Sequence, residues 1–191
     1  MNDEVKRIFE GIDVPEEDIQ ECGFDKKCFE VYNCIGRMFT PKTVLEIGTR
    51  RGYSLVGLCK GNKSIETVLS CDDESYIESS QGVACTNLKK SGYSGEMSFY
   101  RMSSHSEEFK NSLKGQKYDY IHIDGDHDKP GVILDLELCL KHLEKGGLMV
   151  VDDYNYIIDV KEATDEFVKQ HNLGIVVIDS YRGTALVQRR T

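Results

Sequence analysis

Residues 44–54 read VLEIGTRRGYS, a short apolar run that passes through one carboxylate into a turn containing two glycines. An apolar run of this length that stops at glycine predicts a buried strand followed by a tight turn. Similar runs recur further along the chain with amphipathic stretches between them, and the next run ends at Asp72-Asp73. Strands that alternate with helices predict right-handed crossovers and a mostly parallel sheet, which is an α/β fold.

From residue 43 onward, the pattern predicts seven strands and five helices. The strands are expected at residues 43–47, 67–71, 97–102, 118–123, 147–151, 174–178 and 184–188. The helices are expected near residues 53–60, 76–91, 106–113, 132–143 and 159–171. The helix at 132–143 should end at Gly146-Gly147, and the short link at 179–183 predicts a hairpin, hence an antiparallel edge of the sheet.

The first 40 residues have a different pattern from the rest of the chain. Val5, Ile8 and Phe9 have helical spacing, and residues 29–39 predict a second helix. A chain of 191 residues is long enough for one domain with a sizeable core but short for two. We therefore expect residues 1–40 to form an N-terminal helical cap on a domain that spans residues 41–191. The cap should cover the binding edge of the sheet or form the surface of a homodimer.

Composition limits the partners and the location of the protein. The formal net charge is −9, and such a surface repels phosphate backbones, so nucleic acid is not expected as a partner. No stretch approaches the roughly 20 apolar residues that span a bilayer, so no membrane association is expected. The N-terminus lacks the apolar core of a signal peptide, and the seven scattered cysteines fit a reducing compartment. We therefore expect a cytoplasmic protein.

Acidic side chains follow three of the expected strands. Asp72 follows the second strand, Asp124 the fourth, and Asp152 and Asp153 the fifth. Because ligands of such sheets bind outside the carboxyl ends of the strands, these acids should lie around one binding site.

The segment from Glu46 to Gly52 indicates what kind of ligand this site takes. A carboxylate two residues before the first glycine opposes a pyrophosphate and favours a cationic group, such as the amino group of a sulfonium ligand. The third glycine of a dinucleotide-binding turn is missing, which counts against a nicotinamide cofactor. The alternatives are a plain turn, or a phosphate that meets Arg50 and Arg51.

Asp72 lies about 20 residues past the glycine turn, the spacing at which an acid that binds a ribose diol is expected. Asp73 could take the same role. The alternative is that both acids only open the following helix, where acids are favoured.

Three stretches together carry a resemblance to a known family. VLEIGTRRGYS (44–54), CDDES (71–75) and YDYIHIDGDHDKPGVILDLELCLKHLEKGGLMVVDDY (118–154) resemble the class I S-adenosylmethionine-dependent methyltransferases. The D-G-D-H and G-G-x-x-x-x-D-D signatures are most similar to the branch of small-molecule and sugar O-methyltransferases. The resemblance implies a three-layer Rossmann-like fold with a seven-stranded, mostly parallel sheet and an antiparallel edge hairpin.

The resemblance also implies where S-adenosylmethionine binds. Glu46 and Gly48 would line its methionine end, and Asp72 would hold its ribose. The other cofactor-binding candidates are Thr49, Gly52, Ser54, Ser103 and Asp124. Many relatives have a G-D-S segment after the third strand, whereas this chain has Met102-Ser103-Ser104 and lacks the acid.

Asp124, Asp152 and Asp153 form a candidate metal site. Carboxylates at close range repel one another and raise their own pKa values unless a cation neutralises them, and a hard divalent ion is the natural partner. Magnesium is the default choice, and it would orient a substrate hydroxyl and lower its pKa. The alternative is that Asp152 and Asp153 cap the next helix while Asp124 is a solvated turn residue.

His127 and Asp124 are the candidate catalytic residues. His127 lies three residues past Asp124 and titrates near neutrality, so it could remove the hydroxyl proton. The alternative is a structural histidine. Tyr154 and Asn155 could contact the substrate.

The sequence therefore predicts transfer of a methyl group from S-adenosylmethionine to a hydroxyl of a small molecule, with a sugar among the acceptors considered and magnesium as an auxiliary ion. Two other functions stay open at this point. One is an NAD(P)-dependent oxidoreductase on a similar sheet, and the other is a non-catalytic module that binds an adenosyl ligand.

Overall fold

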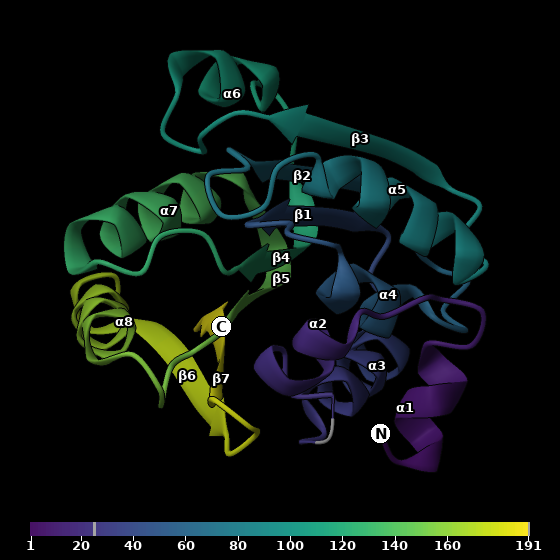
Figure 1. Ribbon diagram of the computed structural model, residues 1–191. Helices are drawn as coiled ribbons and strands as arrows, with labels where there is room; N and C mark the ends of the chain where they lie inside the picture. The colour runs from purple at the N-terminus through teal and green to yellow at the C-terminus, as the bar shows by residue number, and fades with distance from the viewer. Residues whose placement is uncertain (25, 191) are drawn as a thin grey trace.

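The computed structural model describes residues 1–24 and 26–190, in which seven strands form one sheet of order β3-β2-β1-β4-β5-β7-β6 (Figure 1). The strands are β1 (Thr43–Ile47), β2 (Thr67–Asp72), β3 (Glu96–Arg101), β4 (Tyr118–Ile123), β5 (Leu143–Val151), β6 (Leu173–Ile178) and β7 (Thr184–Arg189). Strands β1 to β5 pair in parallel, whereas β7 is antiparallel to both β5 and β6. The predicted mostly parallel sheet with an antiparallel edge hairpin is confirmed.

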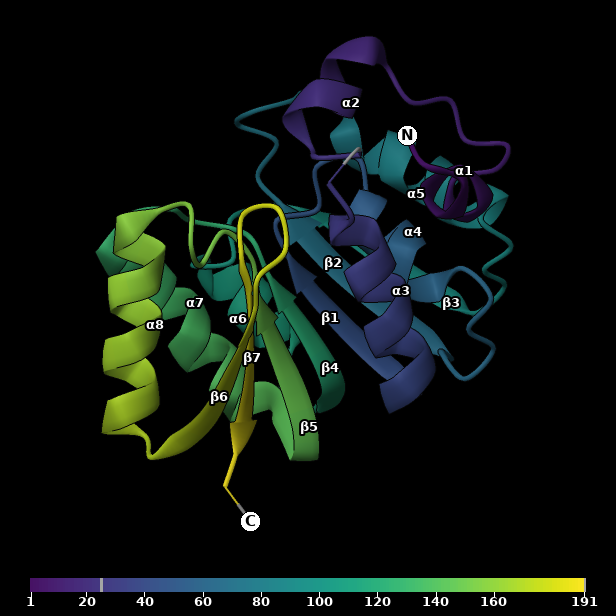
Figure 2. The same ribbon diagram turned by 90° about the horizontal axis from the view of Figure 1, so that it is seen from below.

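Helices cover both faces of this sheet and give the three layers (Figures 1 and 2). They are α1 (Asp3–Ile8), α2 (Glu16–Glu21), α3 (Cys28–Phe39), α4 (Tyr53–Cys59), α5 (Ser80–Lys90), α6 (Glu107–Ser112), α7 (Lys129–His142) and α8 (Ile158–Gln170). Helices α6 to α8 share one hydrophobic cluster with the sheet, and α1, α3, α4 and α5 share a second cluster on the opposite face. No helix within residues 1–24 and 26–190 is both long and apolar enough to span a membrane.

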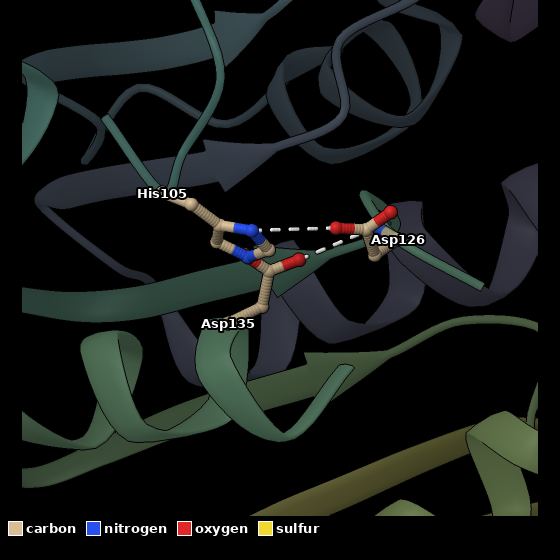
Figure 3. Close-up of side chains that lie close together, drawn as sticks. All are labelled: His105, Asp126 and Asp135. Carbon is tan, nitrogen blue, oxygen red and sulfur yellow. Dashed lines mark hydrogen bonds and ion pairs between the residues drawn. The ribbon is translucent and has the colours of Figure 1, made fainter. Parts of the chain in front are cut away.

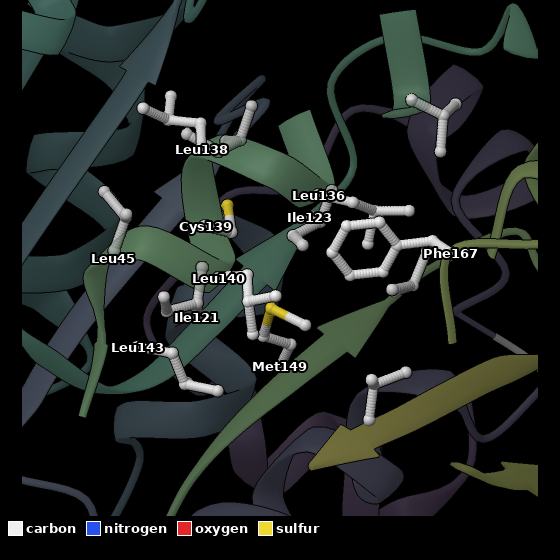
Figure 4. Close-up of a cluster of buried hydrophobic side chains, with 14 of the residues drawn as sticks. Leu45, Ile121, Ile123, Leu136, Leu138, Cys139, Leu140, Leu143, Met149 and Phe167 are labelled. Atoms are coloured by element: carbon white, nitrogen blue, oxygen red, sulfur yellow. The ribbon is translucent and has the colours of Figure 1, made fainter. Parts of the chain in front are cut away.

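Successive residues of the strands alternate between the two clusters. Leu45 and Ile47 of β1 belong to the cluster under α7, while Val44 belongs to the cluster under α3 and α4. Figure 4 shows the first cluster, in which Leu136 of α7 and Phe167 of α8 point at the sheet. Burying a leucine or phenylalanine side chain contributes about 1.5–3 kcal/mol, so two buried faces hold the strands rigidly and fix the edge where they end.

Gly146-Gly147 does not cap α7 as predicted. The helix ends at His142, one residue before the predicted end, because Leu143 is buried and already pairs with Tyr118 as the start of β5. Gly146 does adopt a positive φ of 80°, but it lies in an irregular stretch of β5 between two pairings with β4. The glycine therefore marks a bulge in a strand and not a helix end.

The first 40 residues contain three helices where the sequence predicted two. Pro15 precedes α2, and the aromatic rings of Phe9, Phe24 and Phe29 pack together behind it, with ring centroids of Phe24 and Phe29 4.5 Å apart. Tyr53 of α4 joins this group, 5.0 Å from Phe24. The N-terminal helices thus share a core with the layer that covers the sheet, as Figure 2 shows on the side of α4 and α5.

A buried acid fastens α2 to the turn after β1. The Asp18 carboxylate is only 1% exposed and accepts hydrogen bonds from the guanidinium groups of Arg50 and Arg51 and from the Tyr53 hydroxyl. The two arginines of VLEIGTRRGYS therefore share a protein carboxylate as their counterion, and Arg50 also lines both pockets.

Replacing Asp18 with asparagine should lower the free energy of unfolding by about 2 kcal/mol, because two partly exposed arginines lose their shared buried counterion. Urea unfolding followed by circular dichroism measures this loss. Glu17→Gln, an exposed change on the same helix, is the matched control and should alter stability by less than about 0.5 kcal/mol. Equal effects of the two variants would contradict the anchoring role of Asp18.

Candidate active site

A pocket of about 570 Å³ opens at the carboxyl ends of the parallel strands. Its lining includes Gly48 after β1, Asp72 at the end of β2, Ser103 after β3, Asp124 after β4 and Asp153 after β5. A second pocket of about 90 Å³ adjoins it and shares Gly48, Asp124 and Asp153 with it. The acids that the sequence predicted around one site are therefore brought together by the topology of the sheet.

Backbone hydrogen bonds set the spacing of these strand ends. The N–H groups of Gly48, Asp124 and Asp152 donate to the carbonyls of Cys71, Ile47 and Ile123, at 2.9, 2.9 and 3.1 Å. The parallel ladder thus continues one residue past each strand. Because of this, the first residue of each loop lies beside its neighbour from the next strand.

Gly48 allows the turn after β1 to pack directly against the backbone of the loop after β4. It has a positive φ of 83°, and a Cβ atom placed on it would lie 1.9 Å from the carbonyl oxygen of Asp124. Only a residue without a side chain fits between the turn after β1 and the loop after β4.

Asp72 is held rigidly at the pocket wall. One of its carboxylate oxygens accepts from the N–H of Arg50 at 2.7 Å, and the other accepts from the N–H of Glu74 at 2.6 Å. Each carboxylate oxygen can accept a second hydrogen bond, so the geometry leaves Asp72 able to bind a pair of hydroxyls on a ligand.

Glu46 lies beneath the pockets and does not line either of them. It is fully buried on the face under α3 and α4, in register with Ser70 and His122 of the neighbouring strands. Its oxygens accept from the hydroxyls of Ser54 and Ser70, and Nδ1 of His122 lies 3.3 Å away. The carboxylate therefore supports Ser54 and the turn, and it reaches a ligand only through such groups.

Two of the remaining residues predicted to bind the cofactor line a pocket, and the third packs helices together. Thr49 and Ser54 line the smaller pocket, and the Thr49 hydroxyl is hydrogen bonded to Ser70. Gly52 has a φ of 71° and precedes α4, where a Cβ atom would lie 2.8 Å from the Cβ atom of Ala84. Gly52 is thus required for the packing of α4 on α5, away from both pockets.

Three titratable groups gather between the two pockets. Ligand atoms of Asp124, His127 and Asp153 all lie within 4.8 Å of one another. Nε2 of His127 is 3.4 Å from Asp124 and 3.7 Å from Asp153, and the hydrogen bond to Asp124 raises the pKa of the imidazole. Burial raises the pKa of Asp153 to about 7, with further contributions from Asp124 and Asp152.

Asp152 differs in position from the other two acids of the predicted metal site. It lines the smaller pocket together with Asp124 and Asp153 but does not belong to the group of three described above. Burial, followed by the nearby Asp124 carboxylate, raises its pKa. The alternative in which Asp152 and Asp153 cap the next helix does not hold, because α8 follows Ile157 without a side-chain cap.

One oxygen of Asp153 has no protein partner. Oδ1 of Asp153 is buried and unpaired within the described part of the chain, while Oδ2 lies 3.4 Å from Arg182. A buried carboxylate oxygen without a donor is costly, and a divalent cation bound with Asp124 would satisfy it. The acids present therefore fit a hard metal ion.

Arg182 connects the turn between β6 and β7 to the N-terminal helices, beside the smaller pocket. It lies in the turn between β6 and β7 and donates to the backbone carbonyl of Glu21 at 2.9 Å. Its guanidinium also stacks on the rings of Tyr156 and Tyr181, at 4.7 and 5.3 Å from their centroids. Tyr181 in turn packs against Gly23, where no side chain would fit.

A second cluster lies at the far end of the larger pocket, and Figure 3 shows its three side chains, His105, Asp126 and Asp135. Nε2 of His105 lies 3.0 Å from Asp135, and Nδ1 lies 3.5 Å from Asp126. Asp135 is fully buried, and its burial raises its pKa.

Comparison with known proteins identifies the family. The family model described as a methyltransferase domain matches residues 45–154, more than half of the chain. The chain belongs to the methyltransferase domain family. The predicted family is therefore confirmed, and the match runs from the glycine turn to the acids after β5.

Individual relatives of this methyltransferase are distant. An uncharacterized protein of Acanthamoeba polyphaga mimivirus is 31% identical over 114 residues, 59% of this chain, and the match spans about half of that curated relative's length, 51%. Among solved structures, the SAH-bound methyltransferase PaMTH1 of Podospora anserina superposes with a TM-score of 0.72 at 15% identity, covering 100% of this chain and 89% of that one. An O-methyltransferase of Bacillus cereus in complex with SAH gives a TM-score of 0.64 at 14% identity, covering 100% and 92%. These structures confirm the predicted fold.

The family match closes one alternative, and the structure adds one residue to the site and removes another. Membership of this family removes the support for an NAD(P)-dependent oxidoreductase. Asp135 was missed, although an acid beside Val132 and Leu136 on the apolar face of an amphipathic helix is a signal that could have found it. Tyr154 is buried and donates to Asp165 outside both pockets, so the structure does not place it beside a substrate.

Proposed function

We propose that this methyltransferase transfers the methyl group of S-adenosylmethionine to a hydroxyl of a small molecule. The observation that carries the proposal is one continuous site in which Gly48 and Asp72 line the larger pocket and the acids Asp124 and Asp153 stand where it meets the smaller one. The ribose would bind Asp72, and the methionine end would pass Gly48 toward Thr49 and Ser54. Structural relatives crystallised with SAH support the choice of this cofactor.

The proposed acceptor side is the part of the site where the two pockets meet. Asp124, Asp153 and Arg182 line both pockets there. A hydroxyl there would lie beside Asp124 and Asp153. A divalent ion held by these acids, with magnesium as the proposed ion, would bind that hydroxyl and lower its pKa.

The chain's own residues then align the reactants and take up the proton. Methyl transfer is a direct displacement, in which the new C–O bond forms as the C–S bond breaks, so the alignment of donor and acceptor is the main contribution of the protein. The proton of the hydroxyl would pass to Nε2 of His127, which lies between Asp124 and Asp153.

The mouth of the site favours a sugar among the hydroxyl acceptors. Tyr76 and Tyr156 line the larger pocket with largely exposed rings, and Tyr181 lines the smaller one. Aromatic rings with one polar end suit a ligand that has both apolar C–H faces and hydroxyls. We propose that the N-terminal cap, residues 1–40, together with the turn of Arg182, closes over such an acceptor.

The test is methyl transfer measured with S-adenosylmethionine labelled in its methyl group. S-adenosylhomocysteine should bind by calorimetry with or without magnesium, because Gly48 and Asp72 need no ion. Transfer to a panel of sugars and other hydroxyl compounds should require magnesium and should fall by about 100-fold or more with a chelator. Binding without transfer to any acceptor would indicate a non-catalytic adenosyl-binding module, and transfer that survives the chelator would establish a metal-free enzyme.

A further inference from the structure

The part of the larger pocket beyond Asp72 has a lining that suits a flat heterocycle. Cys71 and Met102 line it with apolar surface, and Ser103, Gly125 and Asp126 line its edge. If the ribose binds Asp72, the base attached to it falls in this region. The loop after β3 offers no acid there, which leaves open what recognises the exocyclic amine of adenine.

Asp126 brings a carboxylate to this edge from a different loop. It lies between β4 and α7, and its side chain is about half exposed, at 49%. Gly131 at the start of α7 packs against it, since a Cβ atom on Gly131 would lie 2.6 Å from the Asp126 side chain. Nδ1 of His105 lies 3.5 Å from its Oδ2 on the other side. The carboxylate is therefore held in place at the pocket rim.

Asp135 of α7 holds both loops of this region together. Its Oδ1 accepts from the hydroxyl of Ser104 at 2.6 Å and lies 3.0 Å from Nε2 of His105, both in the loop after β3. Its Oδ2 accepts from the N–H of Asp126 at 3.3 Å, in the loop after β4. One buried carboxylate thus links the segment that carries Ser103 to the segment that carries Asp126.

The same three residues do not suit a metal ion. Asp126 and Asp135 face opposite nitrogens of the His105 ring, as Figure 3 shows. An ion between the two carboxylates would have to displace the imidazole that already bridges them. Instead, the buried Asp135 holds the His105 ring, and the ring in turn orients the Asp126 carboxylate at the rim of the pocket.

We propose that the Asp126 carboxylate accepts a hydrogen bond from the exocyclic amine of the adenine of S-adenosylmethionine, with His105 and Asp135 as positioning residues. The proposal rests on the proposed function. A carboxylate can only accept, so it selects an amine at this position and rejects a carbonyl. Asp126 thereby supplies, from the loop after β4, the acid that the segment Met102-Ser103-Ser104 lacks.

The test compares two ligands that differ at this edge of the base. S-adenosylhomocysteine carries the amine beside an unprotonated N1, and S-inosylhomocysteine carries a carbonyl oxygen beside an N1–H group. Calorimetry on the unaltered protein should show a preference for S-adenosylhomocysteine of about 10-fold or more, the size expected for one hydrogen bond to a charged group. In Asp126→Asn the preference should fall to within about 3-fold, because an amide can also donate to the carbonyl.

Two further variants sharpen the result. Asp73→Asn removes another carboxylate that lines the same pocket and should keep the preference within about 2-fold of its original value. His105→Gln should reduce the preference while Asp126 is still present, a change in ratio that general destabilisation would not produce because both ligands use the same fold.

The outcomes separate the two proposals. If the unaltered protein binds neither ligand, the proposed function fails and this inference with it. If it binds S-adenosylhomocysteine but Asp126→Asn keeps the full preference, or Asp73→Asn loses it, the cofactor proposal stands and the role of Asp126 is overturned.

Discussion

In buffer without divalent cations, Asp153→Asn should be more stable than the unaltered protein at pH 8, by up to about 4 kcal/mol. Burial raises the pKa of Asp153 from its usual 3.8 to about 7, and a difference of that size corresponds to about 4 kcal/mol between the two protonation states. The folded carboxyl keeps its proton where the unfolded one has lost it. The unaltered protein therefore loses stability as the pH rises from about 4 to about 7.

The substitution is suited to this measurement because it changes little else. Asp153 has a positive φ of 57°, a conformation that asparagine also tolerates. Urea unfolding at several pH values between 5 and 8, with a chelator present, should show the advantage of the variant growing with pH. Magnesium should then stabilise the unaltered protein at pH 8 and leave Asp153→Asn almost unchanged. Parallel pH profiles for the two proteins would contradict a raised pKa for this buried carboxylate, one oxygen of which has no partner in the structure.

Gly48→Ala should reduce the affinity for S-adenosylhomocysteine by more than about 100-fold and lower the melting temperature. The added Cβ atom would lie 1.9 Å from the carbonyl oxygen of Asp124, and both groups belong to backbone that the sheet holds in place. The strand ends must then separate, which moves the acid of the proposed metal site as well as the turn that faces the methionine end.

Gly61→Ala is the matched control for this prediction. Gly61 also has a positive φ, 75°, but no atom lies within 4 Å of the Cβ position. The substitution should lower the free energy of unfolding by about 1 kcal/mol, because alanine disfavours the left-handed backbone conformation, and it should leave ligand affinity unchanged. Calorimetry and thermal unfolding of both variants separate backbone strain from the collision at Gly48. Equal losses of affinity in the two variants would show that the contact with Asp124 is unimportant.

The sequence predicts the central strands well and the surrounding helices less well. The bounds of β1 and β4 agree with the expectation, because a strand covered on both faces is a mostly apolar run that ends at a polar turn. The start of β5 at Leu143, four residues before the predicted strand, could not be predicted, since it depends on pairing with Tyr118, which is distant in sequence. The three short N-terminal helices depend on packing against Tyr53 and its neighbours more than on their own pattern.

The sequence likewise predicts some features of the candidate site and not others. The parallel topology alone predicts that Gly48, Asp72 and Asp124 meet, because the carboxyl ends of neighbouring strands share one edge. The sequence cannot tell that Asp153 rather than Asp152 faces His127, since the left-handed backbone at Asp153 decides which side chain turns toward it. The burial of Asp135 depends on Ser104 and His105, which come from a separate loop.

The bond between Arg182 and the carbonyl of Glu21 joins positions 161 residues apart in the chain. During synthesis the N-terminal helices and the glycine turn leave the ribosome long before the last hairpin does. The wall that Arg182 and Tyr181 give to the smaller pocket is absent until that hairpin has emerged and docked. A nascent chain can thus form most of the larger pocket before the β6–β7 hairpin supplies its part of the wall of the smaller pocket.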